Sequence, residues 1–128
     1  MLLRTKLYLP PPPVNAVTRP RLHNRLNDGL ATGFLLISAP AGFGKTSLVA
    51  HWIDVAKPLG HSPTTPHVAW LSLDEGDNDP LRFLSYLVSA LQTVDSTLCT
   101  TVLLLLEAPQ PPAIDALLTM VINELSNW

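Results

Sequence analysis

Hydrophobic positions change their spacing along the chain, and each change predicts a different element. In the N-terminal part, Leu22, Leu26 and Leu30 share one helical face, so the sequence predicts a short helix over Arg21–Leu30. The apolar run 34–38 is short and partly β-branched, as expected of a buried parallel strand. A helix followed by a buried strand is therefore predicted in the first third of the chain.

The same reasoning predicts five further segments. Apolar residues return at helical spacing three times, and turn-forming residues separate the segments. The predicted segments are a helix from Lys45 to about Ala56, a Pro/Gly/Ser/Thr loop over 57–66, a strand over His67–Leu73, a helix with apolar positions from Leu81 to Leu91, and a last helix over Ile114 to Leu125. Asp79 is expected to cap the second of these helices, with Pro80 as its first helical residue. Strands that alternate with helices indicate an α/β fold.

The junction between the first strand and the next helix has the layout of a phosphate-binding P-loop. Gly42 and Gly44 permit backbone angles that other residues resist, and they leave room for a phosphate beside the main chain. Successive N–H groups and the positive end of the following helix would then surround an anion. The predicted nucleotide-binding residues of this loop are Ala41, Gly42, Phe43, Gly44, Lys45, Thr46 and Ser47.

Three side chains at the start of the helix predict the chemistry of the ligand. Lys45 would reach the β- and γ-phosphates as a point charge, and Thr46 would offer its hydroxyl to Mg²⁺. Ser47 would bond an outer phosphate. Ala39 stands where the usual pattern begins with glycine, and it adds only one methyl group. The sequence thus predicts ATP or ADP with Mg²⁺ as ligand, against the alternative of a Gly-rich turn without a ligand.

Composition limits the other classes of function. The chain has 128 residues, of which 47% are hydrophobic and 14% charged, and its net charge of −2 gives no electrostatic case for nucleic acid. The single cysteine, Cys99, excludes an internal disulfide and is expected to be a buried, inert thiol. Neither a secretory signal nor a membrane span is recognisable, so we expect a cytoplasmic protein. His23, His51, His61 and His67 lack the spacing of metal ligands.

Four separated motifs carry a resemblance to a known family. The chain resembles the large ATP-binding LuxR-family transcriptional regulators, also called MalT-like regulators, which are P-loop NTPases of the STAND class. The motifs are Thr5-Lys6-Leu7, Val17-Thr-Arg-Pro-Arg-Leu22, Ile37-Ser-Ala-Pro-Ala-Gly-Phe-Gly-Lys-Thr46 and Val68-Ala-Trp-Leu-Ser-Leu-Asp-Glu-Gly-Asp-Asn-Asp-Pro80. The resemblance implies a module that switches between ADP-bound and ATP-bound forms. It also implies a role for Arg19 beside the nucleotide, with Arg21 as a weaker candidate.

The resemblance also implies parts that the chain lacks. The Walker B strand with its paired carboxylates is missing, and so is the family's DNA-binding domain. Without Walker B, hydrolysis of ATP by this chain is doubtful. We interpret Asp74 and Glu75 as turn residues, with metal contact as the alternative. The expected organisation is an extended arm over 1–20 and a partial P-loop domain over 21–128, truncated before Walker B.

Such a truncated module would lack the strands that normally separate the two predicted ones. These two strands must pair directly, leave a gap or await a partner chain, so we expect marginal stability and self-association. Three functions stay open: a nucleotide-binding part of a LuxR-family regulator, a small autonomous kinase or hydrolase, and a truncated remnant without function. No contact with DNA or membrane is expected from this chain.

Overall fold

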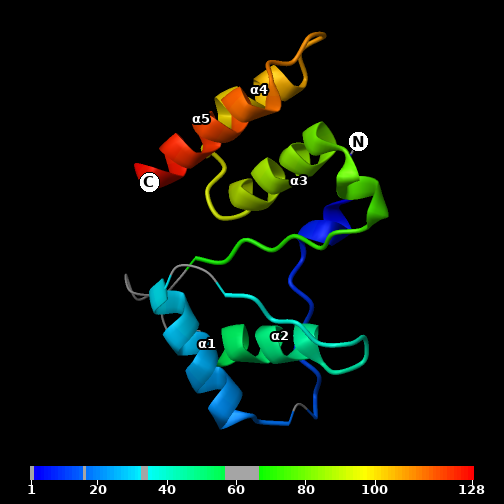
Figure 1. The fold of residues 1–128 in the computed structure, drawn as a ribbon, viewed down its shortest axis with the longest axis vertical. Coiled ribbons are helices and arrows are strands. Elements are labelled where there is room, and N and C mark those ends of the chain that lie inside the picture. The colour runs from blue at the N-terminus through cyan, green and yellow to red at the C-terminus, as the bar shows by residue number, and fades with distance from the viewer. Residues whose placement is uncertain (1, 16, 33–34, 57–66) are drawn as a thin grey trace. The chain divides into compact units, whose positions relative to one another are not determined.

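The computed structural model describes residues 2–15, 17–32, 35–56 and 67–128, and the regular elements within them are all helical (Figure 1). Two of these elements are short 3-10 helices, labelled η, and five are α-helices. In chain order they are η1 (Arg4–Leu7), α1 (Pro20–Thr32), α2 (Lys45–Ala56), η2 (Glu75–Asn78), α3 (Pro80–Gln92), α4 (Thr100–Leu106) and α5 (Ile114–Ser126).

The predicted α/β fold with parallel strands is wrong, because the described residues contain no β-strand. Residues 35–38 and 67–73, where strands were predicted, have no regular structure. Leu35 and Leu36 are 40% and 76% exposed, whereas a buried parallel strand would cover both. A strand exists only where a neighbour takes up its N–H and C=O groups, and a local apolar run cannot supply that neighbour. Phe34 and the predicted loop 57–66 lie outside the described residues.

The helix predictions agree better with the structure. Helix α1 extends the predicted helix over Arg21–Leu30 at both ends, and α2 has the predicted bounds. Asp79 caps α3 as predicted, since its Oδ1 accepts a hydrogen bond of 3.2 Å from the amide of Leu81, and Pro80 is the first helical residue. Helix α5 agrees with the last predicted helix. Helix α4 was not predicted, because its seven residues are too few to establish a period.

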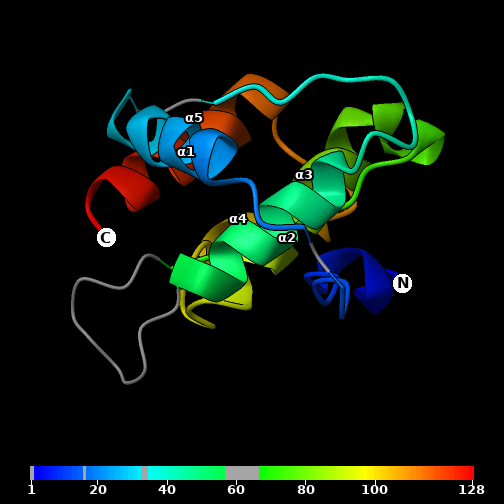
Figure 2. The same ribbon diagram turned by 90° about the horizontal axis from the view of Figure 1, so that it is seen from below.

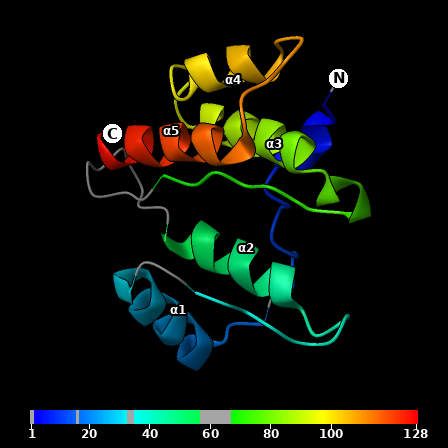
Figure 3. The ribbon, with the colours of Figure 1, turned by 45° about the horizontal axis from the view of Figure 1, so that its top comes forward.

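Two compact units divide the chain, one formed by Met1–Tyr8 with His67–Trp128 and one by Leu9–Pro66. We call them the three-helix unit and the loop unit. In the three-helix unit, α3, α4 and α5 pack against one another (Figure 3). Their contacts are built on a core of apolar side chains that are at most 3% exposed. These core residues are Leu84, Val88, Leu98, Cys99, Val102, Leu117 and Val121.

Cys99 is fully buried in this core, which confirms the expectation of a buried thiol. Burial raises the pKa of the Cys99 thiol, so the reactive thiolate is disfavoured. Its backbone has a φ of 55°, a left-handed conformation that is uncommon for any residue but glycine. The amide of Cys99 donates a 2.6 Å hydrogen bond to Oε1 of Glu124 in α5, which links the start of α4 to the third helix.

A lysine near the N-terminus ties the first residues to the acidic turn before α3. The Nζ of Lys6 lies 2.7 Å from Oδ2 of Asp74 and 2.7 Å from Oδ2 of Asp77, and it lies 4.6 Å from the ring centroid of Tyr86. The amide of Ser72 donates a 2.9 Å hydrogen bond to the carbonyl of Lys6. Residues Lys6 and Asp77 are both only 8% exposed. Two of the motifs that carry the family resemblance are thus joined by an ion-pair cluster.

Hydrogen bonds to Lys6 are the main reason why the pKa values of Asp74 and Asp77 are lowered, and the same bonds raise the pKa of Lys6. Asp74 also accepts a 2.8 Å hydrogen bond from the amide of Gly76, within the capping box of η2. Both carboxylate oxygens of Asp74 are therefore occupied within the protein, which favours its interpretation as a turn residue over a metal contact.

The loop unit is built on α1 and α2, with Leu26, Ala50 and Ile53 buried. The indole Nε1 of Trp52 in α2 donates a 2.8 Å hydrogen bond to Oδ1 of Asn27 in α1. Residues 35–44 precede α2 and contain no helix, and Figure 2 shows that this segment turns back just before it enters α2.

Candidate functional site

The loop in front of α2 has the backbone conformation that glycine permits. Gly42 and Gly44 have φ values of 86° and 77°, whereas Phe43 between them does not have a positive φ. The amide of Phe43 donates a long 3.4 Å hydrogen bond to the carbonyl of Pro40, which closes a turn. A Cβ added at either glycine would meet no atom within 4 Å. The glycines are thus required by backbone angle, and the space beside them is open.

Helix α2 begins at Lys45, immediately after this turn. The first helical hydrogen bond of α2 is the one that the amide of Leu48 donates to the carbonyl of Gly44, at 2.8 Å. The amides of Lys45, Thr46 and Ser47 precede that bond, so they have no acceptor within the helix. They supply partial positive charge at the open side of the loop, which is the arrangement that favours an anion.

The side chains of the first helical turn differ in what they contact. The Nζ of Lys45 donates a hydrogen bond to the carbonyl of Ala39, so the ammonium lies against the loop that precedes it. Thr46 and Ser47 are exposed, and so are Ala41 and Phe43, the latter by 64%. The hydroxyls predicted to serve Mg²⁺ and phosphate are therefore accessible to solvent.

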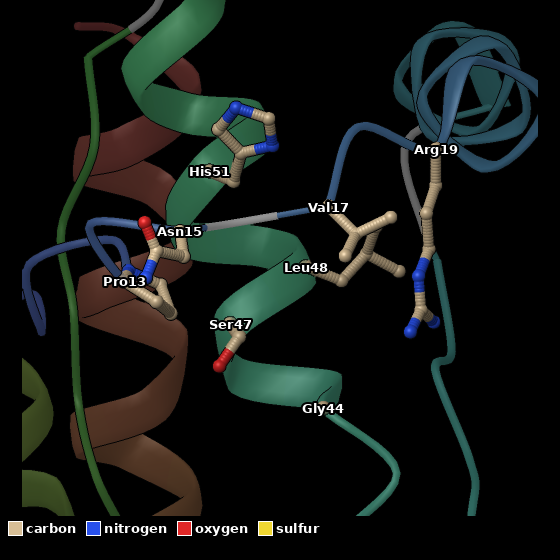
Figure 4. Close-up of a pocket in the computed structure, with 8 residues that line it drawn as sticks. All are labelled: Pro13, Asn15, Val17, Arg19, Gly44, Ser47, Leu48 and His51. Carbon is tan, nitrogen blue, oxygen red and sulfur yellow. The ribbon is translucent and has the colours of Figure 1, made fainter.

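An open hollow of about 160 Å³ lies beside the start of α2 (Figure 4). The chain before α1 forms one part of its wall and α2 forms the other. In the view of Figure 4, Val17 and Leu48 lie between Arg19 and Ser47. The lining residues are Pro13, Asn15, Val17, Arg19, Gly44, Ser47, Leu48 and His51.

The structure brings together three of the predicted site residues at this hollow. Arg19, Gly44 and Ser47 line it, although Arg19 is 25 or more positions away in the sequence. The remaining predicted residues of the loop are adjacent in the chain but do not line the hollow. They are Ala41, Gly42, Phe43, Lys45 and Thr46. Arg21 is exposed on α1 and does not line it either.

Sequence reasoning missed the other residues of the wall. Asn15 and Pro13 belong to the segment 1–20, which was predicted to be an extended arm, and neither residue was predicted to have a role in the site. His51 is one helical turn after Ser47, so the period of α2 alone would have placed both on the same face. That signal was present in the sequence.

Metal ligands are sparse in the described parts of the chain, where no group of three or more His, Cys, Asp or Glu side chains could hold an ion. A lone hydroxyl such as that of Thr46 does not bind Mg²⁺ by itself, because this ion takes its ligands from carboxylates, water and substrate phosphates. The described helices also include none that is long and apolar enough to cross a membrane.

Comparison with known proteins gives the family context. No family model matches the chain, and no solved structure matches it. The chain is 38% identical over its full length to the "HTH-type transcriptional regulator MalT" of Serratia proteamaculans, and it is 37% identical to the proteins of that name from Yersinia pestis and Yersinia pseudotuberculosis. In each case it spans 13% of the relative's length. These identities confirm the resemblance inferred from the four motifs: over its whole length the chain is similar to a small part of the MalT regulators.

Proposed function

We propose that the loop in front of α2 binds the phosphates of ATP or ADP, with Mg²⁺, and that it serves nucleotide-dependent control of transcription in a MalT-like regulator. This proposal implies a cytoplasmic location, because a regulator of transcription has to reach DNA. The contact with DNA would be made by a part of the regulator outside this chain. The relatives are named as transcriptional regulators, which supports the regulatory half of the proposal.

One observation carries the nucleotide half. Gly42 and Gly44, two positions apart, both have positive φ values, and the second one directly precedes a helix of 12 residues. A phosphate at this place would meet the unpaired amides of the first helical turn and the positive end of the helix. The same backbone would be strained with other residues at the two glycine positions, so a tight turn with this shape requires that particular sequence.

Two cations add to this backbone site. Lys45 belongs to the first turn of α2, and its ammonium can exchange the carbonyl of Ala39 for a phosphate oxygen without leaving the loop. Arg19 lines the hollow together with Gly44 and Ser47, so its guanidinium supplies a second positive charge. The hollow of about 160 Å³ is smaller than the roughly 300–1,000 Å³ of complete ligand pockets, so we expect it to enclose only part of a nucleotide.

Hydrolysis requires a group that orients and activates water beside the phosphate. Among the residues that line the hollow there is no Asp or Glu. We therefore expect this chain to bind nucleotide weakly and not to turn it over.

A calorimetric titration of the chain with ATP in the presence of Mg²⁺ tests the proposal. Replacing Lys45 by alanine removes a charge-assisted hydrogen bond worth about 1.5–3 kcal/mol, which corresponds to a loss of affinity of about 10- to 150-fold. Arg25→Ala is the matched control, because Arg25 is an exposed cation of α1 that does not line the hollow. Its affinity should equal that of the wild type.

Equal affinities of the wild type and Lys45→Ala would refute the assignment of the loop. Absence of binding by the wild type would instead favour a remnant without function. Release of phosphate above background would contradict the expected lack of turnover and would favour the autonomous hydrolase. Sedimentation of the same samples tests the predicted self-association.

A further inference from the structure

Two histidines that are distant in the sequence face each other in the loop unit. His23 belongs to α1 and His51 to α2, and their ring centroids lie 5.1 Å apart with the ring planes tilted by 59°. The Nε2 atom of His23 is buried and has no hydrogen-bond partner among the described residues. A buried imidazole nitrogen without a partner costs free energy, so such an atom calls for a ligand or a functional reason.

The separation of the two rings is compatible with a shared metal ion. Zinc binds imidazole nitrogen at about 2.0–2.1 Å with tetrahedral geometry, which places the centroids of two bound rings about 5.2 Å apart. The observed 5.1 Å agrees with this value. The tilt of 59° excludes parallel stacking, whereas an edge-to-face contact such as that of His67 with Trp128, at 5.1 Å and 66°, has the same separation. The buried Nε2 of His23, which lacks a partner among the described residues, is therefore the observation that points to an ion.

The surroundings suit an ion that keeps water ligands. His51 lines the open hollow, so solvent can reach its side of the pair. Trp52 follows His51 in α2, and Asn27 lies one helical turn after His23 in α1, so the hydrogen bond between Trp52 and Asn27 links the two helices near the histidine pair. The two histidines supply half of a tetrahedral shell, and two waters would complete it, since no third His, Cys, Asp or Glu joins them among the described residues.

We propose that His23 and His51 form a two-histidine site for a zinc-type divalent cation, which links α1 to α2. Spacing in the sequence could not reveal this pair, because the fold alone brings the two positions together. Zinc binding can be tested apart from the nucleotide proposal, since it needs neither Lys45 nor a phosphate, and His51 is the one residue that the pair shares with the hollow.

Calorimetric titration of the nucleotide-free chain with ZnCl₂ tests this proposal. The wild type should bind one Zn²⁺, and His23→Gln and His51→Gln should each lower the affinity at least tenfold. His67→Gln is the matched control, because His67 lies in the three-helix unit against the ring of Trp128, and it should bind as the wild type does. Lack of binding by the wild type, or equal binding by all variants, would overturn the proposal.

A second measurement does not depend on the folding of variants. In NMR spectra of the wild-type histidine rings, one equivalent of Zn²⁺ should shift the signals of His23 and His51 and leave those of His67 in place. Titration with Co²⁺ tests for a sulfur ligand. A sulfur-to-cobalt charge-transfer band would assign the metal to Cys99 and would contradict a site made of histidines.

Discussion

Replacing Leu117 by alanine tests the packing of the three-helix unit. Leu117 is fully buried between α3, α4 and α5, and the change removes three carbon atoms from the core. At about 0.8 kcal/mol per methylene, the lost transfer free energy is about 2.4 kcal/mol. The cavity left behind raises the cost to as much as about 5 kcal/mol if the neighbours do not close it. Since a domain of this size is stable by only about 4–10 kcal/mol, the change is large.

Leu104→Ala is the control for this prediction. Leu104 also lies in a helix, so the chemical change and the gain in helix propensity are the same, but its side chain is 69% exposed. We expect its free energy of unfolding to change by less than about 0.5 kcal/mol. Leu117→Val, which removes one methylene, should cost about 1 kcal/mol and keeps the test informative if Leu117→Ala does not fold.

Urea unfolding followed by circular dichroism at the helix band measures all three variants. With an m value of about 1–2 kcal/mol/M, the midpoint of Leu117→Ala should fall by more than about 1 M. Equal midpoints for Leu117→Ala and Leu104→Ala would refute the packing described here, because the two positions differ mainly in burial.

Two further predictions concern the ion-pair cluster and the glycines. Lys6→Met leaves the buried carboxylate of Asp77 with only the guanidinium of Arg82, whose Nε lies 3.7 Å from Oδ1, and should lower the midpoint of thermal unfolding. In the wild type, the lowered pKa values of Asp74 and Asp77 stabilise the folded state above pH 3.8, their ordinary pKa, and this stabilisation is lost as the pH falls through the lowered values. The raised pKa of Lys6 stabilises the folded state below pH 10.5, its ordinary pKa, and this stabilisation is lost as the pH rises through the raised value. Thermal unfolding across this range should therefore show a plateau that Lys6→Met lowers, and an unchanged profile would contradict the cluster. Gly44→Ala should cost about 1–2 kcal/mol in urea unfolding, because the φ of Gly44 is 77°. Gly29→Ala in α1 should cost less, because the gain in helix propensity of about 1 kcal/mol offsets the shift of Leu35, whose Cδ1 would lie 2.7 Å from the added Cβ. The opposite order would refute the assigned loop conformation.

Local signals in the sequence predicted the helices well. The bounds of α2 and the cap of α3 follow from residues within one or two turns, such as Asp79 with Pro80, so no distant contact was needed. The turn before α2 was predicted for the same reason, because the φ values of Gly42 and Gly44 are a local property of glycine.

The failures concern features that depend on distant partners. The apolar runs at 34–38 and 67–73 have the composition of buried strands, but strands require neighbours to accept their hydrogen bonds. The wall that Asn15 and His51 share with Arg19, and the contact of His23 with His51, are likewise products of the fold. Of the candidate site, the sequence could therefore predict the loop but not the surfaces around it.

The ion pairs of Lys6 also have a topological consequence. Because the first eight residues belong to the three-helix unit, residues 9–66 form an insertion that leaves and re-enters it. Closing so long an excursion costs conformational entropy that grows only with the logarithm of its length, about 2 kcal/mol for each tenfold change. The segment 9–66 could therefore gain or lose residues at little cost to the stability of the three-helix unit. Replacing this whole segment by a short linker should leave a helical protein that folds by itself.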